Sequence, residues 1–182
     1  MRLLRLFEKK HEIKQDQQFE RLLKLDAGSR LQFNSKIWIV KKILEYNWGD
    51  NINSFDFIVD NGDKLAYIGI EHSGNTFCIS VKYDVALEQF EFDLPDFIAR
   101  NEVPPEHLKI DNIQYQYDRE SVGKCRIEDT SEWMDIISWE FIDKSNNGLL
   151  TIELYSNKEI FASVGKVAHP NDFQIIEEIQ AK

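Results

Sequence analysis

The stretch Ser54-Phe55-Asp56-Phe57-Ile58 alternates polar and apolar residues, ends at the turn Asp60-Asn61-Gly62-Asp63, and precedes two further alternating runs, Ile68–Glu71 and Phe77–Val81. The same succession returns later in the chain as Ser138-Trp139-Glu140-Phe141-Ile142, the turn Ser145–Gly148, and the runs Thr151–Leu154 and Phe161–Val164. A period of two residues is typical of strands with one buried face, and Asn-Gly turns are typical of hairpins. We therefore predict a mainly β protein made of two tandem, similar antiparallel β-units, each a meander or a partly open barrel.

Charge and proline divide the chain further. The first 25 residues carry seven basic and four acidic side chains, whereas the whole chain has a formal charge of -10. An acidic stretch and Pro104-Pro105 separate the two halves, and consecutive prolines do not fit a sheet interior. We predict an N-terminal amphipathic helix over residues 1–24, a first β-unit over 25–92, an acidic, proline-containing linker over 93–107 and a second β-unit over 108–182.

The N-terminal helix has two interpretations. Its apolar residues can pack on the β-units, and we expect this of Phe19 to Leu25. The first ten residues combine an apolar patch with basic side chains, which is the arrangement that favours an anionic membrane surface or an acidic partner. The candidate contact residues are Leu3, Leu4, Arg5 and Phe7.

Composition excludes several classes of protein. With 42% hydrophobic residues and no apolar run of membrane-spanning length, the chain is expected to be a globular protein that folds in water. Cys78 and Cys125 do not form a Cys-x-x-Cys pair, and the N-terminus lacks the features of a signal peptide, so we expect a reducing cytoplasmic location, with peripheral contact to the inner membrane as an option. The net negative charge argues against nucleic acid as a partner.

No motif in the sequence indicates catalysis. The four histidines have no zinc-ligand spacing, and there is no Gly-x-Ser-x-Gly motif and no glycine-rich phosphate loop. Gly62 lies in a turn that resembles part of an EF-hand calcium loop. Counted with Gly62 as the sixth position, the first and last ligand positions would be Phe57 and Ile68, whose side chains have no oxygen to bind calcium. We therefore predict no enzyme, no metal and no cofactor.

Six residues are candidates for a ligand or polycation surface. Glu71 and Glu153 occupy matching positions in the two halves, where two carboxylates could hold a cation, although duplication alone would also match them. Glu132 and Asp135 belong to an acidic run, and Trp48 and Trp133 lie beside polar or turn residues, where rings can line a groove or simply cover strand ends.

The chain resembles an uncharacterised bacterial family, the domain of unknown function numbered 4178. The resemblance extends from about Leu25 to Ile176 and rests on Leu25-Asp26-Ala27-Gly28-Ser29 with Ile37–Val40 behind it, on Phe55-Asp56-Phe57 and Ile68–Glu71, and on Trp139-Glu140-Phe141, Leu150–Glu153 and Gly165. It implies a β-rich, non-enzymatic accessory protein without catalytic residues, in a family often encoded near envelope-stress proteins related to phage-shock protein A.

Three functions remain open from the sequence. The first is an accessory or interaction protein that binds another protein, linked to envelope-stress systems. The second is a small-ligand or polyamine-binding β-module, and the third is an acidic immunity or inhibitor protein. The sequence does not indicate the oligomeric state.

Overall fold

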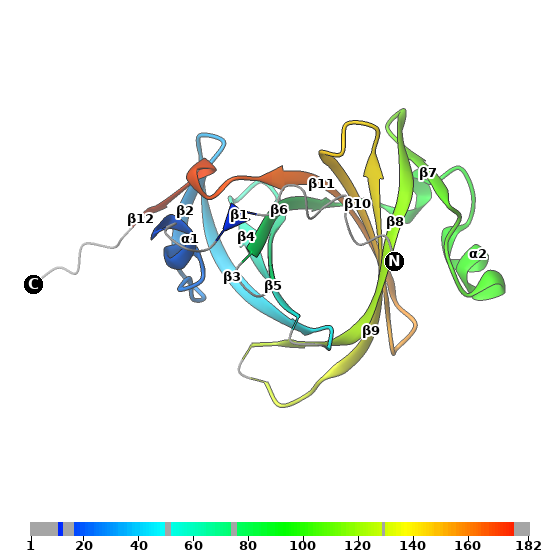
Figure 1. Cartoon of the computed structure of the whole chain (residues 1–182), viewed down its shortest axis with the longest axis horizontal. Coiled ribbons are helices and arrows are strands. Elements are labelled where there is room, and N and C mark those ends of the chain that lie inside the picture. Colours follow the sequence, from blue (N-terminus) through cyan, green and yellow to red (C-terminus); the bar gives the residue numbers. More distant parts are fainter. Residues whose placement is uncertain (1–10, 13–16, 50–51, 74–75, 129, 177–182) are drawn as a thin grey trace, which may run out of the picture.

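The structure is a computed structural model that describes residues 11–12, 17–49, 52–73, 76–128 and 130–176 (Figure 1). The strands are β1 (His11–Glu12), β2 (Arg30–Phe33), β3 (Lys36–Asn47), β4 (Asn53–Asp60), β5 (Leu65–Ser73), β6 (Thr76–Asp84), β7 (His107–Ile110), β8 (Ile113–Ile127), β9 (Met134–Asp143), β10 (Gly148–Tyr155), β11 (Ile160–Ala168) and β12 (Phe173–Ile176). The helices are α1 (Gln17–Leu22) and α2 (Leu94–Asn101), with single 3-10 turns η2 (Leu87–Gln89) and η3 (Pro170–Asp172). The prediction of a mainly β, antiparallel fold with an N-terminal helix is confirmed.

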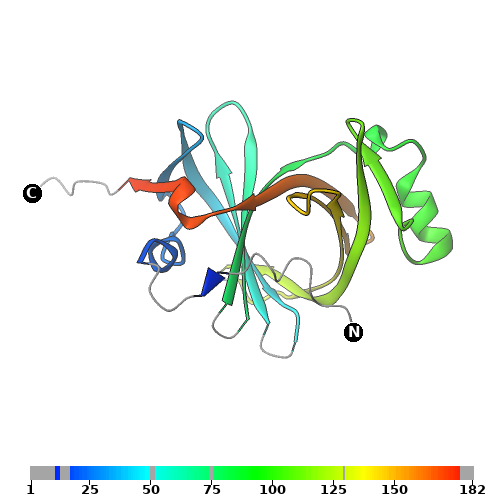
Figure 2. The same cartoon turned by 45° about the horizontal axis from the view of Figure 1, so that its top comes forward.

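All twelve strands belong to one sheet, in the order β12-β2-β3-β4-β5-β6-β11-β10-β9-β8-β7, with β1 beside β6. The sheet also pairs with itself, because Leu44–Asn47 at the end of β3 lie opposite Lys124–Ile127 of β8. This contact closes a ring that runs from β3 through β6, β11 and β9 to β8, as Figures 1 and 2 show. The two long strands each pair with three others, β3 with β2, β4 and β8, and β8 with β7, β9 and β3. Each also contains an irregularity, between Val40 and Lys42 in β3 and between Tyr117 and Arg119 in β8, and such bulges bend a strand.

The two halves share a local arrangement of strands and turns. Each begins with a short strand and a two-residue turn into a long strand, and both turn residues have positive φ: 50° and 59° at Asn34-Ser35, and 50° and 63° at Asp111-Asn112. Such turns match the natural twist of a hairpin. The three strands that follow the long strand are paired in sequential order in each half, β4 to β6 and β9 to β11. Whether the halves are tandem copies stays a prediction.

The two larger apolar cores lie on the outer face of the ring, and a smaller cluster of Tyr46, Cys125 and Ile136 lies on its inner side. In the first half, Phe57 and Ile68 pack with Phe19 and Leu22 of α1. In the second half, Trp139 and other residues of β9 to β11 pack with α2 and β7. Figure 1 shows α1 and α2 on opposite sides of the ring. Because the outer face supplies the two larger cores, the inner face is free to carry polar side chains.

Residues 93–107, predicted as a linker, contain α2. The Asp93 carboxylate caps this helix by accepting a hydrogen bond of 2.9 Å from the Asp96 backbone N–H, and Leu94 and Ile98 are buried in the second core. The segment therefore covers the sheet as well as connecting its halves.

Two expectations need correction. The N-terminal helix is shorter than predicted, because among the described residues only Gln17–Leu22 are helical near this end, while His11 and Glu12 pair with Phe77 and Thr76 of β6. The second β-unit is predicted over residues 108–182, but β12, which lies in this range, pairs with β2 of the first half. At His11–Glu12, pairing with β6 outweighs the helical periodicity of the sequence. At β12, the apolar contacts of Phe173 with the first core favour pairing with β2.

Candidate functional site

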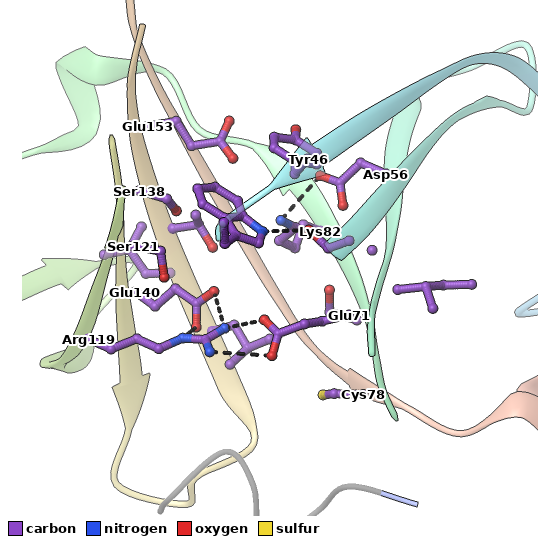
Figure 3. Close-up of a pocket in the computed structure, with 18 of the residues that line it drawn as sticks. Tyr46, Asp56, Glu71, Cys78, Lys82, Arg119, Ser121, Ser138, Glu140 and Glu153 are labelled. Atoms are coloured by element: carbon purple, nitrogen blue, oxygen red, sulfur yellow. Dashed lines mark hydrogen bonds and ion pairs between the residues drawn. The ribbon is translucent and has the colours of Figure 1, made fainter. Parts of the chain in front are cut away.

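The inside of the ring holds a chamber of about 80 Å³ lined by polar side chains of both halves. On β4, for example, Ser54 and Asp56 face this chamber, whereas Phe57 and Val59 belong to the outer core. Figure 3 shows the labelled side chains of the two halves pointing toward one another. The described residues that line it include four carboxylates, Asp56, Glu71, Glu140 and Glu153, but two cations, Lys82 and Arg119.

Arg119 joins the two halves across the chamber (Figure 3). Its guanidinium donates to Glu140 on the neighbouring strand, with Nε to Oε2 at 2.7 Å and Nη2 to Oε1 at 2.8 Å, and to both carboxylate oxygens of Glu71 on β5. Although burial alone would lower the pKa of Arg119, the two carboxylates raise it, so the group stays charged. Three charges bound in this way leave one net negative charge.

The other carboxylates share a single lysine. The Lys82 Nζ lies 3.4 Å from Asp56 Oδ2, and both side chains are largely buried, with 13% and 10% exposed. Glu153, which reaches the chamber from β10 opposite Asp56, accepts a hydrogen bond of 3.0 Å from the Tyr155 hydroxyl. Burial, with a further contribution from the Asp56 charge, raises the pKa of Glu153. This carboxylate therefore lacks part of the positive charge that a buried anion needs.

The surrounding titratable groups are held in their protonated forms. Burial would lower the pKa of Lys82, but the Asp56, Glu153 and Glu140 charges raise it, so the amine remains an ammonium. Burial and the Glu153 charge raise the pKa of the Cys125 thiol to about 11 and raise that of the Tyr46 hydroxyl as well. None of these three groups is the deprotonated nucleophile that covalent catalysis needs at neutral pH.

Two hydroxyl groups that line the chamber have unused hydrogen-bonding capacity. Ser138 and Thr151 are 4% and 5% exposed and line the chamber, and neither side chain hydrogen-bonds to any described residue. Gly69 also lines the chamber, where a Cβ would lie 2.7 Å from Ser80 Oγ and 2.8 Å from Asp56 Oδ1. Unsatisfied hydroxyls in a polar cavity are typical of a place where water or a ligand binds.

Three of the six residues predicted for a ligand surface meet in this chamber: Glu71, Glu153 and Trp48. The registers place the two glutamates equivalently, Glu71 opposite Ser54 and Glu153 opposite Ser138. The indole of Trp48 donates a hydrogen bond of 2.8 Å from Nε1 to Ser54 Oγ, so this ring forms part of the wall.

The other three lie elsewhere. Glu132 is exposed, and Asp135 is exposed at 3.6 Å from Lys124. The Trp133 ring lies beneath the Arg126 guanidinium, 4.6 Å from its centroid. The N-terminal candidates Leu3, Leu4, Arg5 and Phe7 lie outside the described residues, so their contact role stays a prediction.

Sequence reasoning missed Asp56, Lys82 and Arg119. A usable signal existed for Asp56 and Lys82, because each is a charged residue flanked on its strand by apolar or aromatic residues, whereas Arg119 is flanked by Asp118 and Glu120. A charged side chain on a strand in the middle of a closed sheet must point either to water or to a polar interior. Only the closure of the ring decides between these two.

Neither a metal site nor a spanning helix is found in the part of the chain that the structure describes. No group of three or more His, Cys, Asp or Glu side chains there could hold a metal ion. No helix among those residues combines the length and apolarity needed to cross a bilayer.

A comparison with family models matches residues 26–170 to a domain of unknown function, DUF4178. No curated protein and no solved structure matches the chain. The matched segment runs from the residues before β2 to η3 and includes every residue that lines the chamber. The chain therefore belongs to the DUF4178 family of domains of unknown function.

Proposed function

We propose that this protein is a non-catalytic binding module whose ligand carries a small organic cation, held in the chamber by Glu153 and Asp56. The observation that carries the proposal is that the four carboxylates lining the chamber are not equally neutralised. Glu71 and Glu140 share one arginine with full hydrogen bonding, whereas Asp56 and Glu153 share one lysine and the pKa of Glu153 is raised.

Charge arithmetic supports a cation rather than an anion as the ligand. With four ionised carboxylates and two cations, the chamber lining carries two net negative charges, one on each side. Two uncompensated charges in a low dielectric are unfavourable, and an ammonium beside Glu153 would offset one of them. An ammonium also has three hydrogen-bond donors, which could bind the Glu153 carboxylate and the hydroxyl oxygens of Ser138 and Thr151.

The protonation states favour binding over catalysis. Lys82 stays an ammonium because of its carboxylate neighbours, and the pKa of Cys125 is raised to about 11. Glu153 could accept a proton, but a cation bound beside it would lower its raised pKa and keep the carboxylate ionised. These protonation states support a non-enzymatic protein and favour the small-ligand alternative.

Calorimetry with matched probes tests the proposal. Butylammonium and spermidine should release heat with the protein at pH 7.5, and neutral butanol should not. Glu153→Gln should reduce amine affinity about tenfold or more, since a hydrogen bond to a charged group contributes ~1.5–3 kcal/mol. Glu132→Gln, which removes an exposed carboxylate of the same kind, is the matched control and should leave affinity unchanged. Equal behaviour of the two variants, or no binding of either amine, would refute the proposal.

A further inference from the structure

A second, wider hollow of about 470 Å³ adjoins the chamber. The two spaces share the four lining residues Tyr46, Asp56, Lys82 and Glu153, so the hollow begins where the proposed cation site lies. Its volume is in the range of ~300–1,000 Å³ that is usual for small-molecule sites. A ligand held at Glu153 therefore has room to extend into the hollow.

The walls of this hollow differ in chemistry from those of the chamber. The lining contributed by β3, β4, β8, β9 and β11 is largely apolar, with the side chains Leu44, Ile58, Ile127, Met134 and Phe161. Tyr155 packs edge-on against Phe161 with ring centroids 5.5 Å apart. Walls of this kind stabilise apolar ligand groups by excluding water.

The outer edge of the hollow is apolar too. Phe161, Ile127 and Met134 are 50%, 40% and 39% exposed, although each lines the hollow. Exposed apolar side chains that border a cavity are typical of a binding site rather than of an ordinary surface. The cationic site is thus followed by an apolar passage that opens to solvent.

The outer edge of the hollow offers little stabilisation to a second cation. Asp84 accepts a hydrogen bond of 3.0 Å from the Tyr67 hydroxyl, and Glu159 accepts one of 2.7 Å from the Asn157 amide. Lys42 lines the same hollow and opposes another positive charge. Asp84 and Glu159 are exposed, whereas Glu153 is partly buried, so an ammonium gains less beside them than beside Glu153.

We propose that the ligand is an amphiphilic primary amine, with its ammonium beside Glu153 in the chamber and an alkyl or aryl group in the wide hollow. The inference rests on the proposed function and narrows it, because it favours a monoamine with an apolar tail over a diamine or polyamine. It combines the carboxylate of the inner chamber, the hydroxyls of Ser138 and Thr151 and the apolar walls of the hollow.

A series of n-alkylamines from ethylamine to octylamine tests this by calorimetry. Affinity should rise about fourfold for each added methylene that becomes buried, until the hollow is filled. An α,ω-diamine of equal length should bind at least about tenfold more weakly than the monoamine, because its second ammonium would lie between apolar walls.

Two variants locate the tail. Phe161→Ser should flatten the dependence of affinity on chain length while leaving ethylamine binding unchanged. Trp133→Ser removes another exposed ring, outside the hollow, and should leave the whole series unchanged. Circular dichroism and thermal melts would establish that both variants fold.

The outcomes separate this inference from the proposed function. If affinity is independent of chain length, or if diamines bind more tightly than monoamines, the apolar-tail inference is wrong while the cation site stands. If Phe161→Ser and Trp133→Ser behave alike, the tail does not lie in this hollow. If no amine of any length binds, both the inference and the proposed function fail.

Discussion

Leu44 and Arg119 occupy corresponding places in the two halves of the ring: Leu44 of β3 lies directly opposite Asp56 of β4, and Arg119 of β8 lies directly opposite Glu140 of β9. One carboxylate pair therefore has an internal arginine and the other has an aliphatic neighbour at the same position. This difference between the halves leaves Glu153 in need of positive charge.

Leu44→Arg should supply that charge from within the protein. We expect amine affinity to fall about tenfold or more, since a charge-assisted hydrogen bond contributes ~1.5–3 kcal/mol and the new guanidinium competes for the same carboxylates. Calorimetry with butylammonium measures the loss. Leu44→Met keeps the apolar volume without the charge and should bind as the unaltered protein does. Undiminished binding by a folded Leu44→Arg variant would contradict the charge argument.

Arg119→Met should destabilise the fold strongly. The change leaves Glu71 and Glu140 facing each other in a buried place, and loss of one member of a buried ion group costs ~3–5 kcal/mol. Urea unfolding measures the difference. Lys109→Met removes an exposed lysine 3.1 Å from Glu91 and should cost less than ~1 kcal/mol. Adding Glu71→Gln and Glu140→Gln to Arg119→Met should recover much of the loss, and a failure to do so would indicate that packing, not charge, explains it.

Glu153→Gln should stabilise the protein at neutral pH. The pKa of Glu153 is raised in the folded state from an ordinary value near 4.5, so the folded chain binds more protons than the unfolded chain as pH rises through this window. The resulting loss of stability is absent below the ordinary value and complete above the folded-state pKa. Urea unfolding from pH 4 to 7.5 should therefore show a variant that gains relative to the unaltered protein as pH rises. Glu132→Gln should show no such trend, and parallel curves for Glu153→Gln would refute the assignment.

Gly165→Ala should weaken the junction between β6 and β11. Gly165 pairs with Lys82, and an added Cβ would lie 2.0 Å from the Val81 carbonyl oxygen and 2.7 Å from the Lys82 Cα, which the backbone can relieve only by moving. Overpacking costs ~1–3 kcal/mol, and a backbone clash belongs at the upper end. Thermal unfolding should show a clear fall for this variant and little change for Ser163→Ala, two residues earlier on the strand. Equal melting temperatures of the two variants would contradict the expected clash and show that β6 and β11 can move apart to accommodate the added Cβ.

Much of the fold could be predicted from alternation. The runs around Phe57, Ile68 and Trp139 each place large apolar residues on one strand face, and these residues form the observed cores. What alternation does not specify is the direction in which a sheet curls. The contact of β3 with β8 depends on strand twist and on two bulges, which sequence periodicity does not reveal.

The candidate site was predictable to the extent that it follows the repeat. Matching positions indicated Glu71 and Glu153, and both line the chamber. The acidic run from Glu128 to Asp143 was less informative, because its members diverge: Glu140 points into the ring, whereas Glu132 and Asp135 face solvent. Net charge along a strand does not distinguish its two faces. Arg119 remained unnoticed because its partners lie on β5 and β9, far apart in the sequence.

The pairing of β12 with β2 has a consequence for the order of events during synthesis. Phe33 stacks on Phe173 with ring centroids 5.0 Å apart, and the Gln18 amide donates to the Phe173 carbonyl at 2.7 Å, so the first core includes a residue made after the end of the matched segment 26–170. At ~5–20 residues per second, the 140 positions between the two phenylalanines take roughly 7–28 seconds to translate. Throughout that interval the ribosome carries a nascent first half whose apolar face is incompletely covered. A chain released before residue 173 would keep that face exposed and become a substrate for chaperones and proteases.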